Sequence, residues 1–502
     1  MNTNGETAND EAIAASGVAG LDEVLGGGFT PKRLYLVEGV PGSGKTTLAM
    51  QFLLEGVRGN EPVLYVTLSE SKEELEDTAA SHGWTLEGMT IRELVPSDAG
   101  VNDDEYTMFH PSEVELSETI KSILGEVDRL KPRRVVFDSL SELRLLAGNP
   151  LHFRRQILAL KQYFAGRNCT VLLLDDMTSS DRDLQVQSIS HGVILLEQLN
   201  PEYGSDRRRV RVVKYRGRPF RGGFHDYEII HGGLKVFPRL VAAEHRSSSE
   251  RLRLASGIAE LDSLLGGGIE TGSSTLVVGA PGTGKSSLTA QFAAAAAERG
   301  QRTAMFIFDE SIDTLLTRAK SLGIDLPKHV EAGMVKIHPV DPAELSPGEF
   351  VHQIREAVEH DEVNVLVIDS LNGYLNAMPG ERNLIIQLHE LLMYLGQRNV
   401  ATMLVSAHQG LIGAQMTSVV DASYLADAVI LLRYFESQGS IRQAISVIKK
   451  RGGEHERTIR ELWIRNGRIQ IGEPLHNFRG VLTGVPTMET AAQEQLSPKR
   501  GS

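Results

Sequence analysis

The chain has 502 residues, of which 41% are hydrophobic and 23% are charged, so it is too long for one small core and too apolar to be disordered. Its net charge of −13 works against broad, non-specific attraction to DNA or to an anionic membrane. Because Cys169 is the only cysteine, an intrachain disulfide and a metal site made of several cysteines are both excluded, which favours a reducing cytoplasm.

The first residues, MNTNGETANDEAIAAS, lack the basic and then apolar pattern of a secretory signal peptide. No apolar run approaches the roughly 18 residues that are needed to span a bilayer. We therefore expect a cytoplasmic protein without membrane contact, in which residues 1–14 form a disordered leader.

A long internal repeat determines the domain organisation. The segment ASGVAGLDEVLGGG at 15–28 returns as ASGIAELDSLLGGG at 255–268, which is 240 residues later. The stretch VAAEHRSSSERLR between the halves is rich in serine and charge, as linkers are. We expect a first domain at 15–243, a linker at 244–254, a second domain at 255–479 and a flexible tail at 480–502.

Short apolar runs alternate with longer helical patterns in both halves. Unbroken apolar runs suit strands that are buried on both faces, and intervening helices imply parallel pairing. The predicted fold class is α/β, with two tandem, mostly parallel sheets flanked by helices. The expected strands lie at 33–39, 62–68, 133–139, 169–175 and 191–197 in the first half, and at 274–280, 302–308, 363–370, 400–406 and 427–434 in the second.

Each half contains a phosphate-binding loop directly after its first predicted strand. GVPGSGKT at 39–46 and GAPGTGKS at 279–286 both satisfy the pattern G-x-x-x-x-G-K-[ST]. The glycines let backbone N–H groups point at phosphate oxygens, the lysine neutralises the β- and γ-phosphates, and the hydroxyl that follows binds Mg²⁺. The residues expected to bind ATP are Gly42, Ser43, Gly44, Lys45, Thr46 and Thr47, and Gly282, Thr283, Gly284, Lys285, Ser286 and Ser287.

Magnesium also needs a carboxylate at the end of a neighbouring strand. VVFDS supplies Asp138 and VLVIDS supplies Asp369, each at the carboxyl end of an apolar run, where ligands bind in open α/β sheets. An Asp before Ser can instead cap the next helix. With a phosphate-binding loop on the same sheet, we expect Asp138 and Asp369 to complete two Mg²⁺ sites with Thr46 and Ser286.

Acidic residues follow the second strand of each half and are candidates for activating water. The first half has Glu70 after Ser69, and the second has Asp309 and Glu310. The alternative is a solvated helix start, because acids favour the first turn of a helix. We expect catalysis to depend on Lys45, Glu70, Lys285, Asp309 and Glu310.

A basic pair lies late in each half, in KYRG at 214–217 and KKRG at 449–452. Side chains two apart on a strand share a face, so Lys214 with Arg216, and Lys449 with Arg451, are expected to grip one anion together, across a subunit boundary. The alternative is a solvated basic strand. The run RRRVRVVKYRGRPFR at 207–221 is also the best sequence argument for nucleic-acid binding.

These motifs together resemble the KaiC family of two-domain ATPases. The resemblance covers nearly the whole chain, from the SG-x-x-x-LD-x-x-LGGG lead through both loops and both DS motifs to DAVILLRYFE and IKKRGGEHERTIREL. It implies two RecA-like P-loop domains per chain, assembled as two rings in an ATP-dependent homohexamer, with the two basic pairs reaching the neighbour's nucleotide. It also implies a regulatory partner that docks on the C-terminal tail.

The resemblance further implies slow ATP hydrolysis and serine/threonine autokinase activity in the second domain. The family has two consecutive Glu residues after the second strand of each domain, and here Ser69 and Asp309 replace the first of them. Ser69 cannot act as a carboxylate base, so hydrolysis in the first half depends on Glu70. We interpret the loop at 39–47 as the one that holds a ring together and the loop at 279–287 as the one that moves phosphate.

The family's phosphoacceptor pair falls on Ser423 and Tyr424 in DASYLADAVILL. The phenolic oxygen of Tyr424 lies several ångströms further from the backbone than a Thr hydroxyl, which does not suit in-line geometry made for Thr. We therefore expect phosphorylation at Ser423 and not at Tyr424, in a slow signalling or timing switch.

Two other functions remain open. A RecA- or RadA-like DNA-dependent ATPase shares the same core, although the acidic charge and the lack of a further DNA-binding module oppose it, so nucleic acid is an unexpected partner. A scaffold that nucleotide assembles without catalysis is favoured for the first half by Ser69.

Overall fold

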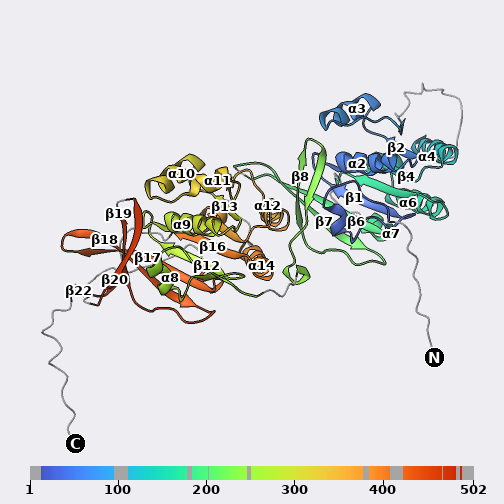
Figure 1. Ribbon diagram of the computed structural model, residues 1–502. Coiled ribbons are helices and arrows are strands. Elements are labelled where there is room, and N and C mark those ends of the chain that lie inside the picture. The colour runs from blue at the N-terminus through green and yellow to red at the C-terminus, as the bar shows by residue number, and fades with distance from the viewer. Residues whose placement is uncertain are drawn as a thin grey trace, which may run out of the picture. The chain divides into compact units, whose positions relative to one another are not determined.

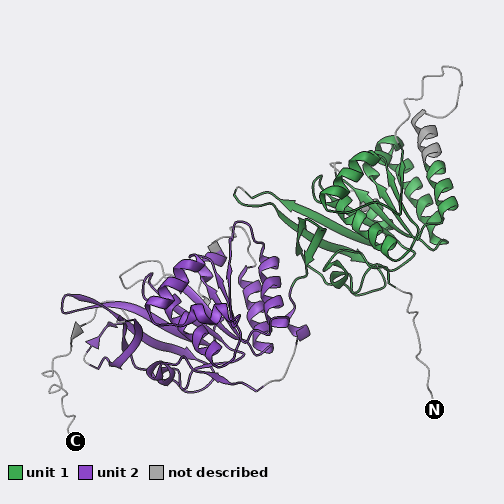
Figure 2. Cartoon of the chain, turned by 45° about the horizontal axis from the view of Figure 1, so that its top comes forward, with its two compact units in different colours: residues 1–239 green, residues 240–502 purple. Residues whose placement is uncertain are grey.

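The computed structural model describes residues 13–94, 111–177, 184–201, 203–245, 250–376, 384–407, 422–465, 467–476, 478–481 and 487–488. The expected leader and tail lie almost wholly outside these ranges. The chain divides into two compact units, residues 1–239 and 240–502 (Figure 2). Leu240 and Ala242, which we expected at the end of the first domain, pack into a core of the second unit, where the backbone N–H of Ala242 donates to Glu390.

The sheet of the first unit has nine strands in the order β3-β2-β4-β5-β1-β6-β7-β8-β9 among the described residues (Figure 1). The strands from β3 to β6 pair in parallel, and β7, β8 and β9 extend the sheet with antiparallel pairs. The strands are β1 (Leu34–Gly39), β2 (Val63–Thr67), β3 (Met89–Glu93), β4 (Arg134–Asp138), β5 (Thr170–Asp175), β6 (Gly192–Leu199), β7 (Arg207–Tyr215), β8 (His225–Ile230) and β9 (Gly233–Phe237).

Helices cover both faces of this sheet, which explains why its central strands are unbroken apolar runs. In β1, Tyr35 and Val37 pack into a core shared with α2, whereas Leu34 and Leu36 pack into a second core shared with α4, α5 and α6. The helices of this unit are α1 (Leu21–Val24), α2 (Lys45–Arg58), α3 (Lys72–Ser81), α4 (Pro111–Leu130), α5 (Leu140–Ala147), α6 (Pro150–Ala165) and α7 (Leu184–Ile189).

The second unit repeats this architecture, with the order β14-β13-β15-β16-β12-β17-β18-β19-β20 in its described sheet. Its strands are β10 (Arg253–Leu254), β11 (Ile269–Glu270), β12 (Ser274–Gly279), β13 (Thr303–Ile307), β14 (Val335–Pro339), β15 (Val365–Asp369), β16 (Ala401–Ala407), β17 (Ala428–Ser437), β18 (Ser440–Lys450), β19 (Arg460–Arg465), β20 (Arg468–Pro474), β21 (Phe478–Arg479) and β22 (Thr487–Met488). Its helices are α8 (Ala259–Leu264), α9 (Lys285–Glu298), α10 (Ile312–Ser321), α11 (Leu326–Glu331), α12 (Pro347–Glu359), α13 (Leu371–Asn376) and α14 (Leu384–Gln397), with 3₁₀ turns η1 (Ala242–His245) and η2 (Ala422–Tyr424).

The prediction of two tandem, mostly parallel α/β sheets is therefore confirmed. All ten expected strands form, and they are the central parallel strands of the two sheets. In both units, β1 and its counterpart β12 lie between two parallel neighbours and lead directly into the helix that follows the phosphate-binding loop. The carboxyl ends of these strands therefore meet at one edge of each sheet, beside that loop.

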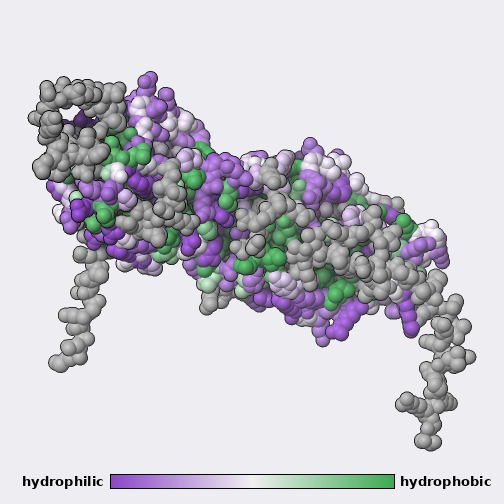
Figure 3. All heavy atoms as spheres, turned by 180° about the vertical axis from the view of Figure 1, so that it is seen from behind, coloured by the Kyte–Doolittle hydropathy of each residue, from purple (hydrophilic) through white to green (hydrophobic). Residues whose placement is uncertain are grey.

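The visible surface on the face shown in Figure 3 is mostly hydrophilic, with small and separate hydrophobic areas. Among the described residues, no helix combines the length and the apolarity that crossing a membrane would require.

Candidate functional site

Both phosphate-binding loops join a buried strand to the N-terminus of a buried helix. Gly44 and Gly284 precede α2 and α9 with φ angles of +85° and +95°, a left-handed conformation that favours glycine. A Cβ at Gly44 would also lie 2.7 Å from Cδ1 of Ile229, and one at Gly284 would lie 2.5 Å from Cδ1 of Ile464. Gly42, Ser43, Gly282 and Thr283 lie in the loops, while Lys45, Thr46, Thr47, Lys285, Ser286 and Ser287 form the first turns of the two helices.

The two lysines curl back over their own loops. Lys45 Nζ donates to the carbonyl oxygens of Gly39 at 2.8 Å and Val40 at 3.1 Å. Lys285 Nζ donates to the carbonyl oxygen of Ala280 at 2.8 Å, and burial lowers the pKa of its ammonium group. Each ammonium group is thus held beside its own loop, close to the N-terminus of the following helix. A helix N-terminus favours an anion.

Asp138 and Asp369 are the last residues of β4 and β15, and both are buried. Oδ2 of Asp138 accepts hydrogen bonds from Thr46 Oγ1 at 3.1 Å and from Tyr65 OH at 2.5 Å. Oδ2 of Asp369 is buried and has no hydrogen-bond partner among the described residues. Burial raises the pKa of both carboxyl groups, to about 6 for Asp369, where the nearby Ser286 hydroxyl opposes the rise. In both halves the peptide bond after this Asp is cis.

The predicted acids lie between the second strand and the next helix of each unit, but their surroundings differ. Within the part of the chain that the structure describes, Oε2 of Glu70 is buried without a hydrogen-bond partner. Burial raises the pKa of Glu70, and the negative charges of Asp138, Glu74 and Asp176 raise it further. Glu70 therefore faces the same cluster as Lys45, whose charge acts in the opposite direction.

In the second unit both acids are engaged by neighbouring side chains. Arg318 donates to both carboxylate oxygens of Glu310, at 2.5 and 2.7 Å, in a bidentate ion pair. Oδ2 of Asp309 accepts a hydrogen bond from Ser370 Oγ at 2.5 Å. The charges of Glu310, Arg318 and Asp309 all act on the pKa of Asp369, so these acids lie near the candidate metal ligand.

Each basic pair holds one backbone segment of its own chain. Lys214 Nζ donates to the carbonyl oxygens of Gln187, Ser188 and Ser190, and Arg216 also donates to that of Ser188, at 2.9 Å. In the second unit, Lys449 Nζ donates to the carbonyl oxygen of Ser423 at 2.9 Å and to that of Ala426 at 2.7 Å. Arg451 donates to the carbonyl oxygen of Tyr424 at 3.0 Å and pairs with Asp427 at 3.4 Å.

The candidate acceptor Ser423 therefore lies on η2, a short turn that the second basic pair holds by its carbonyl groups. Tyr424 beside it is 55% exposed. The charged ends of Lys449 and Arg451 reach the same turn.

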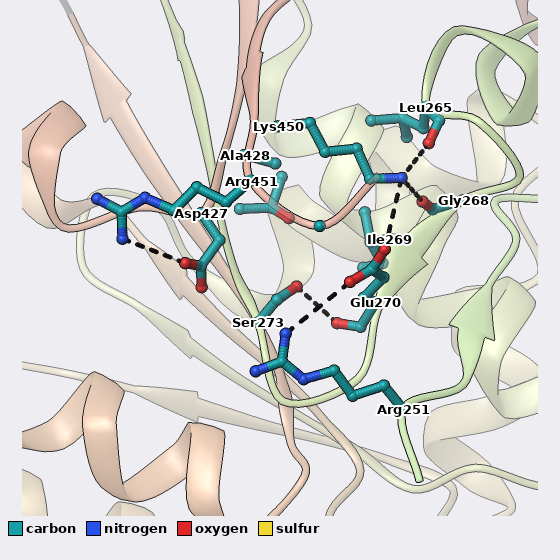
Figure 4. Close-up of a pocket in the computed structure, with 12 residues that line it drawn as sticks. Arg251, Leu265, Gly268, Ile269, Glu270, Ser273, Asp427, Ala428, Lys450 and Arg451 are labelled. Atoms are coloured by element: carbon teal, nitrogen blue, oxygen red, sulfur yellow. Dashed lines mark hydrogen bonds and ion pairs between the residues drawn. The ribbon is translucent and has the colours of Figure 1, made fainter. Parts of the chain in front are cut away.

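Lys450, between the two members of this pair, turns to the opposite side and lines a cavity of about 270 Å³ (Figure 4). Its Nζ donates to the carbonyl oxygens of Leu265, at 2.5 Å, and Gly268, at 3.4 Å. The first unit has Tyr215 and Tyr35 at the matching positions, and their hydroxyl groups lie 3.2 Å apart. Thr275 replaces Tyr35 in the second unit, and this smaller side chain lines the cavity.

Two residues near the sites escaped the sequence analysis. Asp176 follows β5 and forms a 2.9 Å ion pair with Lys45. Burial opposes the ionisation of Asp176, but the hydrogen bond and charge of Lys45 outweigh it and lower the pKa. In the register of the two sheets, Ala407 takes the place of Asp176. The other missed residue is Arg318, whose counterpart at the same position of α3 is Thr78.

Comparison with known proteins agrees with this arrangement. A family model described as "ATPase: KaiC" matches residues 14–241 and matches again at 254–476. The chain is 28% identical over 480 residues to the circadian clock oscillator protein KaiC of Parathermosynechococcus lividus, covering 94% of this chain and 87% of that protein. It is 27% identical over 494 residues to the circadian clock protein KaiC3 of Synechocystis sp., covering 95% of each. Since the family model accounts for most of both units, the chain belongs to the KaiC ATPase family.

Proposed function

We propose that the chain binds Mg·ATP at both phosphate-binding loops, hydrolyses it and transfers phosphate to its own Ser423, as a slow signalling or timing switch. The observation that carries the proposal is the contact between Thr46 and Asp138 at the loop that holds Lys45. It joins the two residue types that bind Mg²⁺ in P-loop NTPases. Ser286 and Asp369 occupy the matching positions beside Lys285, and Ser286 lies near enough to lower the pKa of Asp369.

The residues present fit a magnesium ion. A buried carboxylate needs a cation or a hydrogen bond, and no described residue donates a hydrogen bond to Oδ2 of Asp369. Hydroxyl and carboxylate oxygens are the ligands that Mg²⁺ prefers. Thr46 with Asp138, and Ser286 with Asp369, would hold the ion, which supplies charge that stabilises the β- and γ-phosphates.

Hydrolysis uses the acids after the second strands. A water oxygen forms a bond to the γ-phosphorus while the bond from that phosphorus to the bridging oxygen of ADP breaks. The proton of the water passes to Glu70 in the first half and to Glu310, with Asp309 beside it, in the second. The raised pKa of Glu70 supports this role, because it brings the carboxylate closer to the pH at which a general base is effective.

Autophosphorylation uses the same chemistry with a different nucleophile. The Ser423 hydroxyl oxygen forms the bond to the γ-phosphorus, ADP leaves, and the hydroxyl proton passes to a carboxylate of the second half. The placement of Ser423 on a turn held by Lys449 and Arg451 supports this proposal, because both basic residues are candidates for contacting a nucleotide. Tyr424 shares the turn, but its hydroxyl is too far from the backbone for the same in-line geometry.

Assembly is the remaining part of the proposal. An ATP-dependent homohexamer would bring Lys214, Arg216, Lys449 and Arg451 to the nucleotide of the next subunit, where basic side chains stabilise the transferred phosphate. A regulatory protein would dock on the tail at 480–502, most of which lies outside the described residues. The names of the relatives support a role in timing, since both are called circadian clock proteins.

A DNA-dependent ATPase is the second candidate, and the basic run at 207–221 favours it. Part of the charge of that run is already compensated, because Arg209 pairs with Glu197 and Arg208 with Asp206. A DNA-binding assay at increasing salt distinguishes the two functions. A steep loss of affinity between low and moderate salt would favour the DNA-dependent enzyme, and no measurable binding would favour the switch.

One combined experiment tests the proposal. The purified chain is sized with and without Mg·ATP, and the same sample is mapped for phosphorylation by mass spectrometry. We expect assembly in ATP and phosphate on Ser423, which a Ser423→Ala variant abolishes and a Tyr424→Phe variant retains. Phosphate on Tyr424 instead of Ser423 would overturn the acceptor assignment. Assembly in ATP without phosphate release would favour a scaffold that lacks catalysis.

A further inference from the structure

Arg318 and Glu310 form the bidentate ion pair that distinguishes the second candidate site from the first. Both oxygens of Glu310 are engaged, at 2.5 and 2.7 Å, so neither carboxylate oxygen is free of the guanidinium. Glu310 is also largely shielded from solvent, with 18% of its side chain exposed. A planar guanidinium bound in this way fixes both the orientation and the charge of a carboxylate.

The first half lacks this restraint at the matching position. The helices α3 and α10 both contain ten residues and begin at Lys72 and Ile312, so Thr78 occupies in α3 the position of Arg318 in α10. Correspondingly, Oε2 of Glu70 is buried and receives no hydrogen bond from any residue that the structure describes. The difference between Thr78 and Arg318 therefore accounts for the ion pair that restrains Glu310 and that Glu70 does not form.

The neighbouring acid is restrained as well. Asp309 accepts the 2.5 Å hydrogen bond from Ser370, directly after the candidate metal ligand Asp369. The first half has Ser69 in place of Asp309. Glu70 therefore has a carboxylate oxygen without a hydrogen-bond partner among the described residues, whereas both oxygens of Glu310 are engaged.

We propose that Arg318 is a positioning residue that restrains Glu310 and thereby slows water attack on ATP in the second half. This inference rests on the proposed ATPase function and deepens it. To accept the proton of an attacking water, a carboxylate must turn one oxygen toward that water. Glu310 can do so only when it gives up a charge-assisted hydrogen bond to Arg318, and that loss adds to the barrier of hydrolysis. Glu70 needs no such rearrangement.

The two halves should then differ in their rates of ATP hydrolysis in the opposite order to the one that the sequence suggested. The sequence assigned the movement of phosphate to the second half because it contains Asp309 and Glu310. The contacts of these acids instead favour faster hydrolysis in the first half, where Glu70 is unrestrained.

The test uses full-length variants in which only one phosphate-binding loop is intact. In a Lys45→Ala background, Arg318→Thr copies the first half, and we expect phosphate release to increase about tenfold, the factor that corresponds to one charge-assisted hydrogen bond. The increase should appear in kcat and leave the KM for ATP unchanged, because Arg318 acts on the base and not on the nucleotide. Arg318→Lys should give an intermediate rate, since an ammonium cannot engage two oxygens in the same planar geometry.

The reciprocal variant strengthens the test. In a Lys285→Ala background, Thr78→Arg should lower phosphate release in the first half about tenfold. Lys320→Thr removes an exposed charge from the same helix as Arg318 and should leave the rate unchanged. Circular dichroism and thermal melting are used to check that each variant remains folded.

The outcomes separate this inference from the proposed function. Binding of a fluorescent ATP analogue to the Lys45→Ala parent establishes that the second loop is occupied. If the parent binds the analogue but Arg318→Thr leaves phosphate release unchanged or lowers it, the restraint by Arg318 is overturned and the ATP site stands. If the parent does not bind the analogue, the proposed function fails in this half, and the inference about Arg318 fails with it.

Discussion

Thr46 donates a hydrogen bond of 3.1 Å from its Oγ1 to Oδ2 of Asp138, although the two residues are 92 positions apart in the chain. Thr46 is the second residue of α2, the helix after the phosphate-binding loop, and Asp138 is the last residue of β4. A hydroxyl and a buried carboxylate so placed are the two side chains that a P-loop site uses for Mg²⁺.

Asp138→Asn should therefore weaken the binding of Mg²⁺ in the first half. Because the amide carries no charge, the Mg²⁺ concentration for half-maximal phosphate release should increase by about ten- to a hundredfold. The measurement is a magnesium titration in the Lys285→Ala background. Asp128→Asn, which changes an exposed carboxylate on α4, serves as a control and should not alter the requirement. An unchanged requirement in Asp138→Asn would contradict the metal assignment.

Glu70→Gln should slow hydrolysis in the first half without preventing ATP binding. The amide cannot accept a proton from water, and general bases typically contribute about a hundredfold or more. Steady-state phosphate release in the Lys285→Ala background measures the effect, with Glu73→Gln on the exposed side of α3 as the matched control. Equal rates in the two variants would show that Glu70 is not the base.

The stability of the first unit should depend on His225. Its Nδ1 accepts the backbone N–H of Arg239 at 2.9 Å and its Nε2 lies 3.0 Å from the carbonyl oxygen of Arg221, so the ring is held neutral. Burial lowers the pKa of His225 to about 4, below its ordinary value of 6.5. The stabilising contribution is present above about pH 6.5 and is lost as the pH falls toward 4, because the unfolded chain takes up the proton first.

This linkage should cost the first unit about 2 kcal/mol between pH 7 and pH 5. Urea unfolding followed by Trp84 fluorescence, in a Trp463→Phe background, reports on this unit alone, because these two are the chain's tryptophans. Between pH 7 and pH 5, the His225→Gln variant should lose about 2 kcal/mol less of its free energy of unfolding than the wild type does. The His231→Gln variant, changed at an exposed position, should lose as much as the wild type. The same pH dependence in all three proteins would refute the assignment.

Arg134 should be a strong contributor to the stability of the first unit. It is 5% exposed, pairs with Glu61 at 2.5 Å, and donates to the carbonyl oxygens of Ala15 and Phe52. Arg134→Ala should lower the free energy of unfolding by about 3 kcal/mol, because Glu61 and two carbonyl groups lose their partner.

The same Trp84 fluorescence assay measures this change. The control is Arg58→Ala, which breaks an exposed pair with Glu55 and should cost at most about 0.5 kcal/mol. Similar losses of unfolding free energy in the two variants would mean that the buried contacts of Arg134 contribute no more to stability than an exposed ion pair does.

The central strands of both sheets were predictable, because burial on both faces demands unbroken apolar runs such as LYLVEG in β1. The edge strand β3 was not predicted, since its sequence MTIRE is half-polar and its residues are partly exposed. The boundary near residue 243 was not predictable in detail either. Leu240 and Ala242 follow the last strand of the first unit in sequence, and only packing assigns them to the second.

Site residues were predictable where an acidic residue stands at the carboxyl end of an apolar run. Asp138 and Asp369 follow apolar runs, and the same rule applies to Asp176, which follows the run TVLLLD. Arg318 could not be found in this way. Arg318 lies eight residues after Glu310, and a bend and about two turns of α10 separate them. Regular helix or strand spacing does not predict a contact between two residues so placed.

Phosphate release by four full-length proteins tests the central claim most directly: the wild type, Lys45→Ala, Lys285→Ala and the double variant, each in saturating Mg·ATP. If both loops bind and hydrolyse ATP, each single variant should lose part of the wild-type rate and the double variant should lose nearly all of it. A double variant that releases phosphate at the wild-type rate would contradict the account.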